Sequence, residues 1–164
     1  MAEQAQLNTV LRSIRRIMRA VDIQSKQVMK TVGLTVPQVV ILQTIKDEGA
    51  ITSKRLAEGA NLSPATVVTI LDKLEAKSLV ERKRDTRDRR VVYTSLTRAG
   101  KEALRTAPPL LHHAFSARFG ELSPERRRQI IEALEDVAEM MGAKEIEAAP
   151  VLHVAALEGV GEAP

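Results

Sequence analysis

The chain has 164 residues, of which 44% are hydrophobic and 28% charged, with a formal net charge of +4 and no cysteine. A chain of this length forms one domain, or one domain with an added dimerisation element. The lack of cysteine excludes disulfides, thiolate metal sites and cysteine redox sensors. Only 2% of the residues are aromatic, which argues against stacking platforms for RNA or single-stranded DNA.

The charge is unevenly distributed along the chain. Residues 1–120 hold 21 basic and 11 acidic side chains, a net +10, whereas residues 121–164 hold 4 and 10, a net −6. A basic segment favours a polyanionic partner. The first 20 residues intersperse arginines among apolar side chains, unlike a signal peptide or a membrane span. We therefore expect a cytoplasmic protein with no membrane partner.

The first predicted helix, residues 4–30, carries apolar side chains at three- and four-residue steps. Its stripe is longer than one partner helix covers, so it predicts a subunit interface as well as core packing. After Gly33 a second helix is expected, and Thr52 is expected to cap a third that starts at Ser53. Thr52 and Ser53 would also offer hydroxyls and N–H groups to a phosphate; ordinary capping is the compatible alternative.

Residues 64–77 are predicted to form the reading helix of a helix-turn-helix, after a turn at residues 59–62. Ser63 followed by Pro64 is typical of a helix start. An apolar stripe faces the core and leaves the opposite face to contact a groove. The residues expected on that face are Ser63, Pro64, Ala65, Thr66 and Thr69, with Lys73 further along for a phosphate. These side chains are short, so we expect modest base contacts and a contribution from DNA shape.

A basic hairpin is expected next. Residues 82–90 hold six basic and two acidic side chains, a net +4, between strands at Leu79-Val80 and 91–96. Such a run is as typical of a solvated face as of a binding surface. An arginine at a hairpin tip suits a narrow minor groove, and Asp88 lies close enough in sequence to orient Arg90. The candidate contacts are Arg84, Arg87, Asp88, Arg89 and Arg90.

The rest of the chain is predicted to be helical up to Gly142. Thr97 caps one helix, Pro108-Pro109 breaks it, and Ser123 precedes the last helix. The predicted fold is therefore mainly α with a small β-wing, in one domain over residues 1–142. Dimerisation helices at about 4–30 and 98–142 would flank a winged helix-turn-helix at about 35–97. Residues 143–164 are expected to be a mobile acidic tail.

Catalytic and metal chemistry find little support in the sequence. His112 and His113 are adjacent, so they point in different directions on a helix, and neither has a carboxylate at ligand spacing. A phosphate-binding glycine loop and a nucleophile elbow are both missing. We expect no enzyme activity, cofactor or metal.

Four segments that follow one another along the chain resemble the MarR (multiple antibiotic resistance regulator) family of winged-helix repressors. They are residues 71–75, 79–82, 85–90 and 96–100. The resemblance implies a homodimer with interdigitated terminal helices that binds palindromic double-stranded DNA and is released by a small-molecule effector. It also implies that Thr66 and Thr69 read bases, and that Arg90 enters the minor groove between Arg87 and Arg89. The lack of cysteine excludes the peroxide-sensing branch, and Pro108-Pro109 and the acidic tail are not general family features.

Residues 14–38 resemble a branch of this family linked to ectoine and other compatible-solute genes. The main reading is a DNA-binding transcriptional regulator, a repressor. The alternative is a winged-helix protein-interaction module whose basic wing docks an acidic partner.

Overall fold

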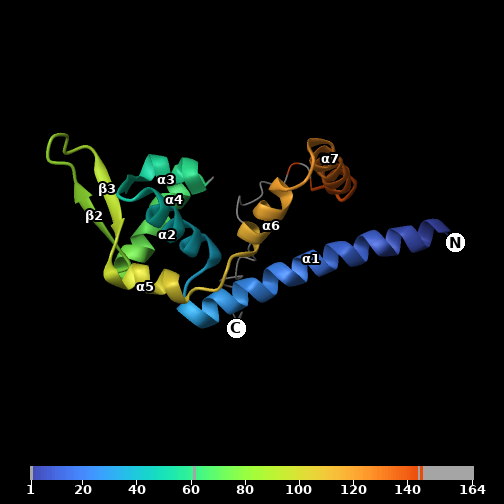
Figure 1. The fold of residues 1–164 in the computed structure, drawn as a ribbon, viewed down its shortest axis with the longest axis horizontal. Coiled ribbons are helices and arrows are strands. Elements are labelled where there is room, and N and C mark those ends of the chain that lie inside the picture. The colour runs from blue at the N-terminus through green and yellow to red at the C-terminus, as the bar shows by residue number, and fades with distance from the viewer. Residues whose placement is uncertain (1, 61, 144, 146–164) are drawn as a thin grey trace, which may run out of the picture.

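The computed structural model describes residues 2–60, 62–143 and 145. In chain order the elements are α1 (Ala2–Val32), α2 (Val36–Glu48), β1 (Ile51–Thr52), α3 (Ser53–Ala60), α4 (Pro64–Ala76), β2 (Val80–Arg84), β3 (Val92–Leu96), α5 (Arg98–Thr106), α6 (Leu111–Gly120) and α7 (Pro124–Met140). The predicted fold class, mainly helical with a small β-wing, is confirmed. The fold is thus a set of helices with one short sheet at one end of the molecule (Figure 1).

The core lies among α2, α3, α4 and the sheet. The strands are antiparallel in the order β1-β3-β2, and Thr94 at the centre of β3 stands opposite both Ile51 and Arg82. Burial of apolar side chains is the main source of stability here. The largest fully buried apolar side chains are Val28, Leu34, Val36, Ile41, Leu42, Ile45, Leu56, Val67, Leu71 and Leu74.

The predicted helix ends are confirmed by local hydrogen bonds. Gly33, with a φ of +65°, follows α1 and donates its N–H to the Met29 carbonyl at 2.9 Å. Ser63, Thr97 and Ser123 each accept a hydrogen bond from the backbone N–H three residues further on, at 3.1, 3.0 and 3.2 Å. These side chains satisfy N–H groups that a helix leaves unpaired at its start. Residues 107–110, which contain both prolines, separate α5 from α6.

Two local predictions were wrong. α3 continues through Gly59 and Ala60, where a turn was expected; Asn61 lies outside the described residues. A Cβ on Gly59 would lie 3.1 Å from Thr44 Cγ2 and 3.2 Å from Glu48 Oε1, so this glycine allows α3 to approach α2. The strand β2 also extends to Arg84, so the first three basic residues of the run at 82–90 belong to the strand.

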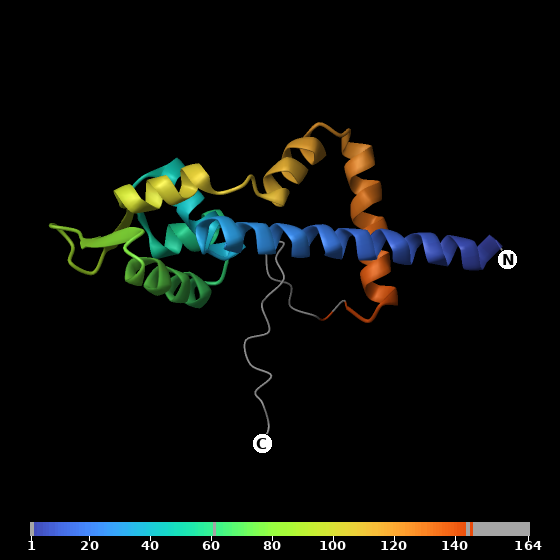
Figure 2. The same ribbon diagram turned by 90° about the horizontal axis from the view of Figure 1, so that it is seen from below.

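The remaining helices extend beyond this core. In both views α1 continues well past the winged part, and α6 and α7 lie at that same end (Figures 1 and 2). In α6 and α7, which are described throughout, no residue is buried. Among the described residues, no single helix has both the length and the apolar composition needed to cross a membrane. Most of the predicted acidic tail, residues 144 and 146–164, lies outside the described residues.

The start of α5 is held against the end of α4 by a tight backbone contact. The Leu79 carbonyl accepts a hydrogen bond from the Thr97 N–H at 3.1 Å, and Thr97 Oγ1 donates to the Ser78 carbonyl at 2.7 Å. Gly100 is buried in this junction, and a Cβ built on it would overlap the Leu79 carbonyl oxygen. Only glycine fits there, because the obstacle is backbone.

We predict that Gly100→Ala lowers the free energy of unfolding by about 2–4 kcal/mol, since either α5 or the start of β2 must move. Chemical denaturation followed by circular dichroism measures this change. Gly120→Ala is the matched control, because a Cβ on Gly120 meets nothing within 4 Å; it should stay within about 0.5 kcal/mol of the parent protein. Equal stability of the two variants would contradict the argument.

Candidate nucleic-acid interface

The helix α4 has one face in the core and one face in solvent. Val67 and Leu74 are fully buried, whereas Pro64, Ala65, Thr66, Thr69 and Lys73 are exposed, as predicted. Val68 is also exposed, at 46%, and was missed because it stands next to the buried stripe and is apolar. Val68 could have been recognised as a candidate contact because it is a β-branched residue on the solvent face of the reading helix. Methyl groups in that position can contact thymine methyls.

The hydroxyls on this face are partly engaged by the helix itself. Ser63 Oγ accepts the Thr66 N–H and lies 2.8 Å from Thr66 Oγ1. Thr69 Oγ1 donates to the Ala65 carbonyl at 3.1 Å. Because these hydroxyls are engaged within the helix, the surface that α4 leaves free is rich in methyl groups. Such a surface suits shape and methyl contacts better than bidentate base recognition.

The tip of the hairpin is ordered by two aspartates. Asp85 Oδ1 accepts the N–H groups of Arg87 at 2.7 Å and Asp88 at 2.9 Å. The N–H of Asp88, and next that of Arg87, lower the pKa of the Asp85 carboxyl from its ordinary value. Asp88 Oδ1 in turn accepts the Arg90 N–H at 3.0 Å. The turn therefore depends on two carboxylates that accept backbone N–H groups.

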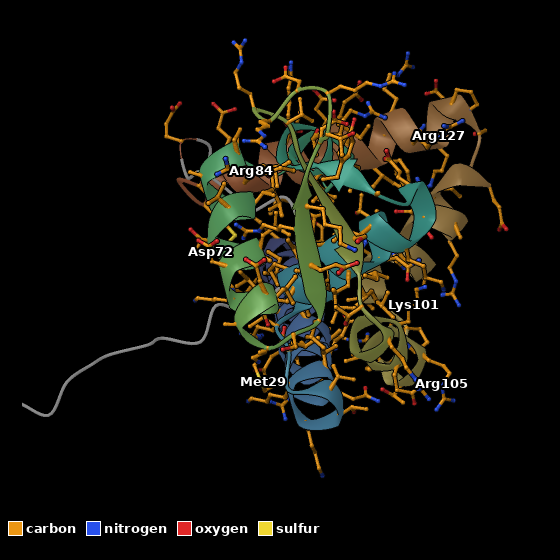
Figure 3. All side chains as sticks on the ribbon, turned by 90° about the vertical axis from the view of Figure 1, so that its left-hand side faces the viewer. Met29, Asp72, Arg84, Lys101, Arg105 and Arg127 are labelled. Atoms are coloured by element: carbon orange, nitrogen blue, oxygen red, sulfur yellow. The ribbon has the colours of Figure 1, made fainter. Side chains whose placement is uncertain are left out.

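The arginines at this tip are largely free. Arg90 is 95% exposed at its side chain, and its Nε lies 3.6 Å from Asp88 Oδ1, the pairing expected from the sequence. An exposed pair of this kind adds only about 0–1 kcal/mol, so it orients the side chain more than it stabilises the fold. In the described part of the chain, Arg84, Arg87 and Arg89 have no ion-pair partner. Viewed from the wing end, Arg84 lies on the hairpin above α4 (Figure 3).

Arg82 and Lys83 differ from the rest of the basic run. Lys83 pairs with Glu81 on the same strand at 3.0 Å. Arg82 turns back towards α4, where its Nη2 lies 2.5 Å from Asp72 Oδ1 and its Nε 3.5 Å from Glu75 Oε2. The sequence placed Arg82 at a projecting tip, and this was wrong because the strand register directs its side chain to the body. The tip therefore carries fewer cations than the run suggests, and of these only Arg90 has an ion-pair partner among the described residues.

The start of α3 shows capping. Thr52 Oγ1 accepts the Arg55 N–H at 3.4 Å, and both Thr52 and Ser53 are half-buried. Arg55 itself is bound by Glu48 and Glu58, each at 3.3 Å, so its charge is already compensated. A phosphate contact by Thr52 and Ser53 stays a prediction.

The histidines do not form a metal centre in the described ranges, where no group of three or more His, Cys, Asp or Glu side chains could hold an ion. The rings of His112 and His113 lie 4.2 Å apart between centroids. Burial, and secondarily the charge of His113, lowers the pKa of His112.

Known proteins with similar sequences or structures are transcriptional regulators. A model of the MarR family matches residues 34–92. The transcriptional regulator HosA of Escherichia coli O111:H- is 31% identical over 110 residues, which cover 67% of this chain and 79% of HosA. The HTH-type transcriptional repressor MdtR of Bacillus subtilis is 31% identical over 54% of this chain; the match spans 57% of MdtR, little more than half of its length.

One solved structure adds a regulatory aspect. BpsR of Bordetella bronchiseptica, whose DNA binding is regulated by 6-hydroxynicotinic acid, shares 26% identity and a TM-score of 0.54. That likeness covers 79% of this chain and 98% of BpsR. The relatives are regulators and not enzymes, in agreement with the sequence. The exposed α4, the adjacent hairpin and these matches together place the chain in the MarR family of winged helix-turn-helix transcriptional regulators.

Proposed function

We propose that this protein is a repressor that binds a palindromic double-stranded DNA operator as a homodimer. The observation that carries the proposal is an exposed, methyl-rich face of α4 beside a hairpin on which Arg84, Arg87 and Arg89 have no ion-pair partner among the described residues. Figure 1 shows α4 and the hairpin at the same end of the molecule. A helix of this kind fits the major groove and an arginine-bearing wing fits the minor groove. MdtR, a repressor, supports the direction of regulation.

The proposed contacts follow from this placement. Ala65, Thr66, Val68 and Thr69 would face base edges, and Ser63, Pro64 and Lys73 would face the backbone. Arg90, oriented by Asp88, would enter the minor groove, and Arg84, Arg87 and Arg89 would neutralise phosphates around it. Thr52 and Ser53 would contact a phosphate at the start of α3. Cationic contacts of this type supply most of the affinity and make it dependent on salt.

The homodimer is supported by apolar surface outside the core. Contiguous exposed apolar patches are uncommon on monomers and mark interaction sites. The large exposed apolar side chains in and next to the terminal helices are Leu7, Val10, Ile17, Met18, Ile23, Met29, Phe115, Ile131, Leu134, Met140 and Met141. A second copy of the same chain would cover them symmetrically. It would also set two reading helices about one helical turn of DNA apart.

We predict that Leu134→Glu converts a dimer into a monomer, because a carboxylate would be buried in the apolar interface. Light scattering should give twice the 18.0 kDa chain mass for the parent protein and a single chain mass for the variant. Glu135→Ala, on the neighbouring exposed position of α7, is the control and should remain dimeric. A monomeric parent protein would contradict the proposed assembly.

Release by a small anionic effector is a further part of the proposal. BpsR supports it, since an aromatic acid regulates that protein. In this chain a hollow of about 590 Å³ lies between α2, β3 and α5. Ile45 and Leu96 contribute apolar surface to it, and Lys46 and Lys101 line it with positive charge. Arg105 also lines it but is paired with Glu102. Such a lining suits an organic anion with an apolar body.

We predict that Lys46→Ala/Lys101→Ala raises about tenfold the concentration of an aromatic carboxylic acid needed to dissociate the DNA complex, since two cations are lost. Fluorescence anisotropy with a panel of such acids measures this concentration. Lys30→Ala, on an exposed position of α1, should behave as the parent protein. An unchanged response of the double variant would show that the effector binds elsewhere.

The protein-interaction alternative is not favoured, because the relatives are transcriptional regulators. We also propose a cytoplasmic location, where such DNA is found. The resemblance of residues 14–38 to regulators of compatible-solute genes stays a prediction, as do the regulated genes.

DNA binding is tested by selection of duplexes from a random-sequence pool, followed by titration of the selected duplex. We predict that Arg90→Ala weakens binding at least about tenfold and reduces the salt slope of the dimer by about 2, because two cations leave the phosphates. The melting temperature should stay within about 2 °C, since the side chain is almost fully exposed. Failure of the parent protein to enrich any duplex would overturn the proposed function.

A further inference from the structure

We propose that Arg82 is a positioning residue that fixes the wing relative to α4 by binding Asp72 and Glu75, without touching DNA itself. This inference rests on the proposed function. We name Arg82, Asp72 and Glu75 together the Arg82 clamp. It joins the two elements that would enter neighbouring grooves, α4 and the hairpin, and so decides whether both can bind at once.

The geometry of the clamp sets it apart from the other ion pairs of the basic run. The Arg82 side chain is 26% exposed, compared with 95% for Arg90 and 73% for Lys83. Its two contacts go to one helix: Asp72 Oδ1 at 2.5 Å from Nη2 and Glu75 Oε2 at 3.5 Å from Nε. The Asp72 contact is a hydrogen bond, whereas the buried Nε has no hydrogen-bond partner in the described part of the chain and is attracted to Glu75 by charge. A planar guanidinium placed between two carboxylates in this way has a defined direction, which a lysine ammonium does not provide.

The strand register explains why Arg82 reaches α4. Alternate residues of a strand share a face, so Val80, Arg82 and Arg84 point to the same side of β2. Val80 is 2% exposed and packs in the core, Arg82 follows at the edge of α4, and Arg84 lies beyond it. The clamp is therefore the attachment of β2 to α4 that lies nearest the tip, while on the other edge of the sheet Thr52 of β1 pairs with Tyr93 of β3. Any rotation about it displaces Arg84 and the whole tip.

The clamp also explains two acidic side chains on a helix proposed to bind DNA. Asp72 follows Val68 and Thr69 by one turn, on the exposed side of α4. If these carboxylates acted only through their charge, removing them would strengthen DNA binding, because phosphates repel them. If they position the wing through Arg82, removing them must weaken binding. The two explanations therefore predict opposite changes in DNA affinity when the carboxylates are removed.

The test compares Asp72→Ala/Glu75→Ala with the parent protein on a duplex that the parent protein selects from a random pool. We expect about five- to tenfold weaker binding, although each chain loses two negative charges. The salt slope should not fall, because no phosphate contact is removed. The matched control is Glu102→Ala/Glu125→Ala, which removes two carboxylates paired with Arg105 and Arg128 away from α4. Unchanged or tighter binding by Asp72→Ala/Glu75→Ala would overturn the inference.

A second variant covers the case in which the double alanine variant does not fold. Arg82→Lys keeps the charge but loses the planar guanidinium that faces Asp72 and Glu75 together. We expect it to melt close to the parent protein yet to bind the selected duplex more weakly. Binding equal to that of the parent protein would reject the clamp. Failure of the parent protein and of the control variant to bind any duplex would instead reject the proposed function.

Discussion

The wing depends on one close backbone approach, that of Gly100 to the carbonyl of Leu79. β2 begins immediately after Leu79, and β3 ends immediately before Thr97. The contact therefore closes the hairpin at its base. Thr97 contributes three hydrogen bonds there: its N–H to Leu79, its hydroxyl to Ser78, and its hydroxyl oxygen from the Gly100 N–H. One cap thus serves both the start of α5 and the attachment of the sheet to the end of α4.

From that base outward, the wing is held in stages of decreasing strength. The base is closed by a backbone contact, which cannot rearrange cheaply, and the Arg82 clamp holds the middle. The tip is ordered by the Asp85 and Asp88 side chains together with backbone hydrogen bonds to and from Val91. The acidic residues of this region are consumed in these internal contacts. Of the tip arginines only Arg90 has an acidic neighbour in the described part of the chain, and its side chain is still 95% exposed, so the tip remains available to a polyanion. The summed net charge of this segment does not show which of its cations are free to bind.

Helix ends and buried stripes could be predicted from the sequence because they depend on neighbours three or four residues away. Ser63, Thr97 and the Val67–Leu74 stripe are of this kind. Arg82 could not be placed, because its direction depends on strand register and on a helix ten residues earlier. Gly59 was misread for a similar reason: its lack of a side chain serves packing of α3 on α2 and not a turn. The site residues themselves were predicted from position, and their contacts with DNA stay predictions.

The terminal helices extend this distinction between local and distant constraints. Their apolar periodicity was visible in the sequence, yet within one chain much of it faces solvent, as with Ile17, Leu134 and Met140. An apolar helix stripe that is not covered within its own chain is costly to expose to water, and such a surface marks an interaction site. If that partner is a second copy, its symmetry sets the distance between the two wings. The reading of an operator would then depend on the interface of the pair as much as on α4, and changes far from the DNA-facing surface would alter which spacing of half-sites is bound.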